Sequence, residues 1–170
     1  MAGMARPAPA ARGGRMQGMT ERAHPLPRSH FRRFQTLTTR WMDNDVYGHV
    51  NNVVHYSLFD TAVNGYLIGA GALDIHAGEV IGLVVQTQCH YFDSLAFPQT
   101  VHAGLRVAKL GRSSVTYELG LFADDAPLSA AVGRFVHVYV ERASRRPVAA
   151  LPEKLHAALA PLLVNSQDPA

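Results

Sequence analysis

Residues 40–52 read RWMDNDVYGHVNN and join a strand-like segment to a helix-like one. The stretch combines acids, a glycine turn, a histidine and two asparagines. A carboxylate just before a helix start lies beside backbone N–H groups that have no acceptor within the helix, and such donors can polarise a carbonyl or hold a developing negative charge. The junction is therefore suited to attack on an acyl group.

The segments on either side of this junction predict a strand and a helix. Residues 34–41 are rich in threonine and aromatic side chains, which favours a strand. After the junction, Asn51 or Asn52 makes a good helix N-cap, and apolar residues recur at helical spacing from Val53 to about Gly69. This pattern predicts one long helix with a buried face.

The rest of the chain changes to a strand-like pattern. Four apolar or alternating runs, near residues 80–92, 101–107, 115–121 and 132–140, predict four consecutive strands. The short turn-forming breaks between them favour antiparallel hairpins. Pro152 then opens a segment with Leu155, Leu159 and Leu162 on one helical face. The predicted fold is α+β: one helix wrapped by a curved antiparallel sheet of about five strands, in a single domain over residues 31–165.

Composition limits the kind of protein this can be. A chain of 170 residues with 48% hydrophobic content can bury a real core. The net charge is +3, but seven arginines precede the main body of the first predicted strand, so residues 1–30 are predicted to be a disordered basic tail and the folded part is nearly neutral. No folded basic patch is interleaved with aromatic residues, which argues against a nucleic-acid partner.

The cysteine, hydropathy and histidine patterns exclude further classes of protein and of binding site. The single cysteine, Cys89, excludes an intramolecular disulfide. No apolar run approaches the roughly 20 residues that span a bilayer, so we expect a cytoplasmic protein with no membrane partner. The histidines lack compact ligand spacing, so neither a metal nor another cofactor is predicted. The exposed edge of such a sheet is most simply protected by a second copy, which predicts a homodimer or homotetramer.

Residues 45–52, DVYGHVNN, resemble the D-x-x-x-H-V-N-N signature of hotdog-fold acyl-CoA thioesterases of the 4-hydroxybenzoyl-CoA thioesterase-like family. The preceding strand, the following helix, the turn at 91–93 and the hairpin at 111–114 fall where that family has them, so the resemblance covers roughly residues 34–163. It implies hydrolysis of an acyl-CoA thioester, with Asp45 as nucleophile or general base. It also implies that the backbone N–H of Asn52 contacts the thioester carbonyl, while His49 and Asn51 hold the geometry.

The same resemblance suggests where coenzyme A would bind. Arg112, Ser113 and Ser114 are similar to positions where relatives meet its phosphates, and a guanidinium with hydroxyls suits that role; the alternative is an ordinary polar turn. The chain departs from the family at His55, where a tyrosine is frequent, and at Val63, where an arginine is frequent. Both departures concern the lining of the acyl pocket.

Several alternatives stay open at this point. Asp43 is expected to be a solvated or turn-bonding acid, and Asp60 is a second candidate for the catalytic carboxylate, because another branch of hotdog thioesterases carries its carboxylate on this helix. The function could also be hydrolysis of an acyl-carrier-protein thioester. A hotdog module that binds acyl-CoA or a partner without turnover is the non-enzymatic alternative.

Overall fold

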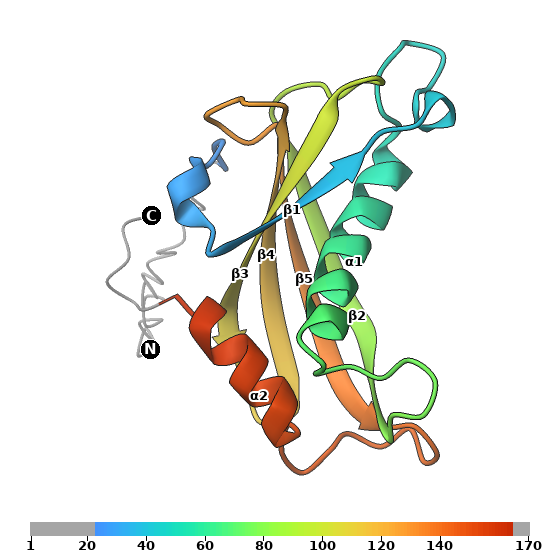
Figure 1. Cartoon of the computed structure of the whole chain (residues 1–170), viewed down its shortest axis with the longest axis vertical. Coiled ribbons are helices and arrows are strands. Elements are labelled where there is room, and N and C mark those ends of the chain that lie inside the picture. The colour runs from blue at the N-terminus through green and yellow to red at the C-terminus, as the bar shows by residue number, and fades with distance from the viewer. Residues whose placement is uncertain (1–22, 165–170) are drawn as a thin grey trace, which may run out of the picture.

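The structure is a computed structural model and describes residues 23–164. One antiparallel sheet runs in the order β1-β3-β4-β5-β2. Its strands are β1 (Arg33–Thr38), β2 (Val80–Tyr91), β3 (Thr100–Leu110), β4 (Ser114–Ala123) and β5 (Ala131–Glu141). Helix α1 (Asn52–Gly69) lies along one face of this sheet (Figure 1). The predicted α+β fold, one helix against five antiparallel strands, is confirmed.

Helix α1 begins where the sequence placed a cap. The side chain of Asn51 accepts a hydrogen bond from the N–H of Val53 at 3.1 Å. The buried face of the helix includes Phe59, whose ring lies over Gly133 of β5; a Cβ at Gly133 would come within 2.6 Å of that ring. The glycine therefore allows the helix to approach the sheet closely, and burying a side chain such as Phe59 contributes about 2 kcal/mol to stability.

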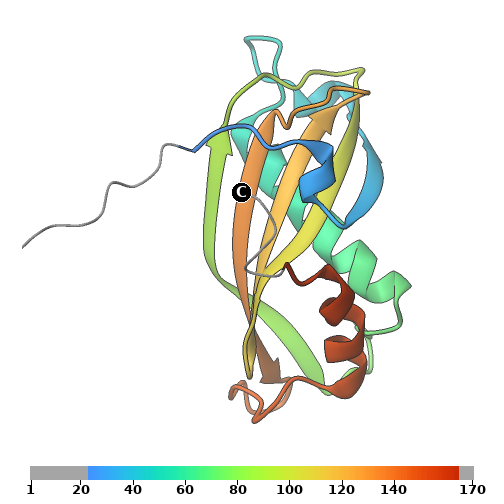
Figure 2. The ribbon, with the colours of Figure 1, turned by 90° about the vertical axis from the view of Figure 1, so that its left-hand side faces the viewer.

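The folded part begins earlier than the sequence predicted. Phe31 is buried against Gly104 and Gly120, and the guanidinium of Arg28 lies 4.8 Å from the centre of the Phe122 ring and donates to the carbonyl of Ala126. Figure 2 shows this segment, with the short turn η1 (Arg28–His30), on the side of the sheet away from α1. Residues 26–30 are thus attached to the sheet, because the N–H of Leu26 donates to the hydroxyl of Ser129 at 2.9 Å and Arg28 donates to the carbonyls of Asp124 and Ala126. The remainder of the predicted tail, residues 1–22, lies outside the described residues.

The first strand and the C-terminal helix, predicted at the two ends of the domain, agree with the structure to different degrees. The first strand ends at Thr38 instead of residue 41, and residues 41–43 form a short 3-10 turn, η2 (Trp41–Asp43). The C-terminal helix α2 (Glu153–Leu159) is present and continues into η3 (Ala160–Leu162); its predicted leucines are buried. Among residues 23–164, no helix is both long and apolar enough to cross a membrane.

Strand β2 forms one edge of the sheet and is open to solvent along most of its length. A bulge interrupts its pairing with β5 between Val84 and Gln86. Because of this extra residue, Val84 opposite His137 and Thr87 opposite Phe135 face the same side of the sheet although they are three residues apart. The side chain of Val85 at the bulge is 60% exposed. A long edge strand with exposed apolar residues is a template for pairing with another chain.

A buried polar cluster lies under the helix in the middle of the sheet. The hydroxyls of Tyr117 and Tyr139 are 2.6 Å apart, and the ring of His137 packs edge-on against Tyr117. His137 is 3% exposed, and its Nε2 has no hydrogen-bond partner among residues 23–164. Burial lowers the pKa of His137 below its ordinary value of 6.5, and the charge of Asp60 opposes that shift.

This histidine should make the protein less stable in mild acid. Since the folded-state pKa is depressed, the unfolded chain binds a proton that the folded chain excludes, and stability falls as the pH drops below about 6.5. His137→Phe removes this linkage, so its melting temperature should decline less than that of the wild type between pH 7.5 and 5. Thermal melts across this range test the difference; parallel curves for the two proteins would contradict it.

Candidate active site

The loop between η2 and α1 holds Asp45 in a fixed position. The N–H of Asp45 donates to the carbonyl of His49 at 2.8 Å, and the N–H of Gly48 donates back to the carbonyl of Asp45 at 3.1 Å. Gly48 has φ +84°, a left-handed conformation that glycine adopts without strain. Oδ1 of Asp45 accepts from the N–H of Tyr47 at 2.8 Å and from that of His49 at 3.4 Å. For Oδ2 there is no hydrogen-bond donor among residues 23–164, so one carboxylate oxygen is anchored and the other is available.

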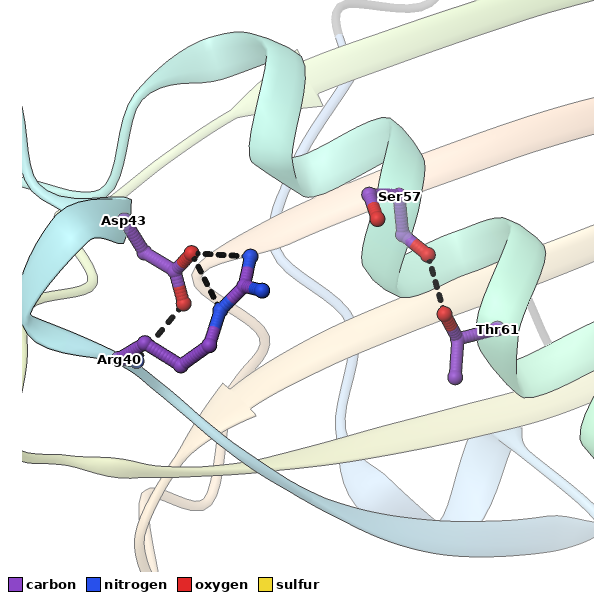
Figure 3. Close-up of polar contacts among 4 residues, drawn as sticks. All are labelled: Arg40, Asp43, Ser57 and Thr61. Carbon is purple, nitrogen blue, oxygen red and sulfur yellow. Dashed lines mark hydrogen bonds and ion pairs between the residues drawn. The ribbon is translucent and has the colours of Figure 1, made fainter.

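Asp43 ties this loop to the rest of the fold. The residue is 2% exposed, and its carboxylate accepts from the backbone N–H of Arg40 at 2.7 Å and from two nitrogens of the Arg40 guanidinium at 2.7 and 3.0 Å (Figure 3). The side-chain hydrogen bonds from Arg40 lower the pKa of Asp43, so the carboxylate stays ionised. The carbonyl of Asp43 accepts from the N–H of Asn51 at 2.8 Å. Asp43 is therefore the turn-bonding acid of the two alternatives, and it is not solvated.

A cavity of about 250 Å³ opens beside the start of α1. Three segments meet there: the acidic loop, the first turn of α1, and the end of β2 with the loop that follows. The cavity brings together three of the predicted site residues, Asp45, His49 and Asn52. Its other lining residues are Val50, His55, Tyr91, Asp93, Ser94 and Leu95. Asn51 lies next to the cavity and acts as the helix cap.

The helix start presents a backbone donor to this cavity. The side chain of Asn51 accepts a hydrogen bond from the N–H of Val53, and the carbonyl of Asn51 accepts one from the N–H of Val54 at 2.9 Å. The N–H of Asn52 comes first in the helix, where no intrahelical acceptor exists, and no other acceptor for it is found in the described part of the chain. The positive end of the helix dipole lies at the same place. This N–H can polarise a carbonyl bound in the cavity.

Two aromatic residues complete the cavity wall. His55 is 4% exposed; its Nδ1 lies 3.2 Å from the carbonyl oxygen of Asn51, and its ring meets the ring of Tyr91 edge-on with centroids 5.1 Å apart. Burial lowers the pKa of His55 and raises that of Tyr91, so both side chains are neutral at pH 7. Sequence reasoning noted His55 as a departure from the family and residues 91–93 as a turn, but it did not place Tyr91, Asp93 or Ser94 at the site.

The predicted coenzyme A residues lie at the other end of the sheet. Thr38, just before the acidic loop, pairs with Thr100 at the start of β3, whereas Arg112 follows Leu110 at the end of that strand. Eleven residues of strand span about 30 Å. Arg112 is exposed and Ser113 and Ser114 are half-buried, and within one chain none of the three lines the Asp45 cavity.

Asp60, the second candidate carboxylate, also lies outside the cavity. It is exposed on α1 and accepts a hydrogen bond from the amide of Asn64 at 3.1 Å. This region of the helix is otherwise regular, and the hydroxyl of Thr61 donates to the carbonyl of Ser57 at 2.7 Å (Figure 3). Within residues 23–164, no group of three or more His, Cys, Asp or Glu side chains is arranged to hold a metal ion.

Solved structures similar to this chain come from several bacteria. PA5185 of Pseudomonas aeruginosa is 57% identical, with a TM-score of 0.82, over 85% of this chain and 100% of that one. PA2801 of the same organism, a predicted thioesterase, is 26% identical, with a TM-score of 0.67, over 79% of this chain and 98% of that one.

A third neighbour is more distant in sequence and supports the fold. Slr0204 of Synechocystis, a 1,4-dihydroxy-2-naphthoyl-CoA thioesterase, is 14% identical, with a TM-score of 0.67, over 75% of this chain and 94% of that one. The fold is therefore the predicted hotdog fold. No curated protein matches the sequence. A sequence profile matches residues 39–159, which is well over half of the chain. By this match, the chain belongs to the thioesterase-like superfamily.

Proposed function

We propose that this protein hydrolyses an acyl-CoA thioester to a free acid and coenzyme A. The observation that carries the proposal is a cavity that contains two groups. One is the carboxylate of Asp45, with one oxygen anchored, and the other is the N–H of Asn52 at the helix start, which has no acceptor among the residues that the structure describes. Membership of the thioesterase-like superfamily supports it. Among the neighbours, SAV2348 of Staphylococcus aureus was solved in complex with CoA, although at 16% identity it supports the fold alone.

The chemistry follows from the charges that develop during the reaction. The thioester carbonyl accepts a hydrogen bond from the N–H of Asn52, which stabilises the oxyanion as it forms. Asp45 either attacks the carbonyl carbon itself or takes a proton from an attacking water. The carbon–sulfur bond then breaks, and the thiolate is a good leaving group. This arrangement of groups can perform the hydrolysis without a metal ion.

We further propose that the active unit is a homo-oligomer that pairs along β2. The exposed apolar side chains of this edge include Leu83, Val84 and Val85, and the acidic loop carries others, Trp41, Met42, Val46 and Tyr47. Two copies that pair β2 antiparallel run in opposite directions. The 111–114 hairpin of the partner would then lie at the same end of the joined sheet as the Asp45 cavity.

This arrangement gives Arg112 a role across the interface. We expect Arg112→Ala to raise KM for acyl-CoA severalfold and to leave kcat largely unchanged, because the guanidinium would bind phosphate far from the reacting carbonyl. Arg145→Ala, which removes an exposed arginine from another hairpin, is the control. Steady-state kinetics with one acyl-CoA measure both constants. An unchanged KM would remove Arg112 from the substrate site.

The proposed activity is tested by measuring thiol release from matched substrates. The purified protein is given aromatic, short-chain and long-chain acyl groups, each linked either to coenzyme A or to acyl carrier protein. Turnover of the CoA esters supports the proposal. Turnover of only the carrier-protein esters would instead identify an acyl-carrier-protein thioesterase, and binding of acyl-CoA without release of thiol would identify a non-catalytic binding module.

A further inference from the structure

The side chain of His55 is held in one tautomer. Its Nδ1 lies 3.2 Å from the carbonyl oxygen of Asn51. A carbonyl oxygen can only accept a hydrogen bond, so Nδ1 must carry the proton. Burial lowers the pKa of His55, which keeps the ring neutral near pH 7. In a neutral ring with the proton on Nδ1, Nε2 is left as a hydrogen-bond acceptor.

This second nitrogen has no partner in the described part of the chain, yet it is not sealed in the protein interior. Among residues 23–164, the one side-chain nitrogen or oxygen that is both fully buried and unpartnered is Nε2 of His137. Nε2 of His55 therefore keeps an opening, although the residue as a whole is buried, and His55 lines the cavity of Asp45. The other titratable groups facing this cavity are His49 from the loop, Tyr91 from β2 and Asp93 beyond it.

We propose that Nε2 of His55 accepts a hydrogen bond from the water that attacks the thioester, while the available oxygen of Asp45 accepts the other hydrogen of that water. The inference rests on the proposed function, with Asp45 acting as general base. His55 is then a catalytic residue. A water molecule has two hydrogens, and Asp45 and His55 each provide an acceptor for one of them. Two acceptors also fix the direction of the water's lone pair, which must point at the carbonyl carbon.

The step balances with these groups alone. The water oxygen forms a bond to the carbonyl carbon as Asp45 takes one proton. The carbon–sulfur bond then breaks, and the proton passes from Asp45 to the departing thiolate. The second hydrogen, which His55 had held, leaves with the carboxylic acid, and this acid ionises in water.

A purely structural role for His55 makes a different prediction. In that case the ring would serve only to brace the carbonyl of Asn51 through Nδ1 and to pack against Tyr91. Two amide substitutions separate the roles. His55→Asn can place an amide N–H near the position of Nδ1 and keeps the brace. His55→Gln can place an amide oxygen near the position of Nε2 and keeps the acceptor for water.

We expect His55→Asn to lower kcat for an acyl-CoA by at least about tenfold, the scale of one lost hydrogen bond in the transition state, with little change in KM. His55→Gln should retain several times more activity than His55→Asn. His76→Gln, at an exposed histidine in the α1–β2 connection, is the control and should match the wild type. The reverse order, with His55→Asn the more active, would overturn the proposal in favour of the structural role.

Two further readouts do not depend on the ranking of kcat. Long-range nitrogen–proton NMR correlations on histidine-labelled protein should show one ring with the proton on Nδ1, and this signal should be absent from His55→Gln. The kcat of the wild type should fall in acid as Nε2 of His55 becomes protonated. This decrease at low pH should be absent from His55→Gln. A proton on Nε2 of His55 would contradict the proposal. So would the same decrease in kcat at low pH in His55→Gln as in the wild type. Neither result would affect the proposed function, which depends on thiol release by the wild type.

Discussion

Asp45→Asn should reduce kcat for acyl-CoA hydrolysis by about a thousandfold, within the range that a positioned general base contributes. The amide neither takes a proton from water nor attacks a carbonyl. Its oxygen can still accept from the N–H groups of Tyr47 and His49, which hold Oδ1 of the aspartate at 2.8 and 3.4 Å, so the loop should keep its shape. Thiol release under saturating substrate measures the loss, and circular dichroism checks that the fold is intact.

Asp60→Asn is the matched control for this experiment. Asp60 is the other carboxylate that the sequence offered for catalysis, but it is exposed on α1 and outside the cavity. We expect this variant to keep near wild-type activity. If Asp60→Asn abolishes turnover and Asp45→Asn does not, the reacting carboxylate is on the helix and the Asp45 assignment is wrong.

The two possible roles of Asp45 differ in the origin of the product oxygen. In a single turnover in ¹⁸O-labelled water, a general base directs labelled oxygen into the acid product. A nucleophilic Asp45 would form an anhydride, and hydrolysis at the aspartyl carbon would leave unlabelled oxygen in the first product. Unlabelled acid in the first turnover, detected by mass spectrometry, would therefore identify a nucleophilic Asp45.

Val85→Asp should split the assembly into monomers and lower kcat/KM by about a hundredfold, the scale of loss when reacting groups are misplaced. Val85 is 60% exposed at the β2 bulge, where a single chain tolerates an acid. In a dimer whose β2 strands pair around their bulges, however, this substitution places two carboxylates close together at the joined edge and removes them from water. Size-exclusion chromatography with light scattering gives the mass, and kinetics on the same sample give the activity.

Ile75→Asp provides the control for the dimer prediction. Ile75 is similarly exposed, at 53%, but lies in the connection between α1 and β2 and not on the strand edge. It should leave both mass and activity unchanged. A monomeric wild type with full activity would contradict a shared site, and so would a Val85→Asp protein that stays assembled and active.

Local patterns predicted the fold because each element carries its own signal. The capping side chain of Asn51 and the apolar spacing after it placed the helix start within one residue of Asn52. Turn chemistry separated the last four strands. The predicted end of the first strand was less accurate, because the buried carboxylate of Asp43 draws the chain at Arg40 into a tight turn. Strand propensity, which depends on single residues, does not predict the ion pair between Arg40 and Asp43.

The contacts made by residues around the start of the predicted domain could not be predicted from the sequence, for a physical reason. Arg28 and Phe31 belong to a basic, proline-containing segment that has no pattern of its own. They are held by partners about 75 to 100 residues away, the Gly104 and Gly120 backbones and the carbonyl of Ala126. Such contacts arise only after β3 and β4 have paired.

The sequence by itself determined the α+β class, the helix cap and the loop that carries Asp45, because these depend on residues that are neighbours in the chain. Only the tertiary structure decided what faces that carboxylate. Tyr91 and Asp93 reach the cavity because β2 ends there, and Arg112 is excluded from it within one chain because the pairing of β1 with β3 sends that hairpin to the far end of the sheet. Strand order and register set the distances between these residues, and neither can be predicted from the local pattern of residues 40–52.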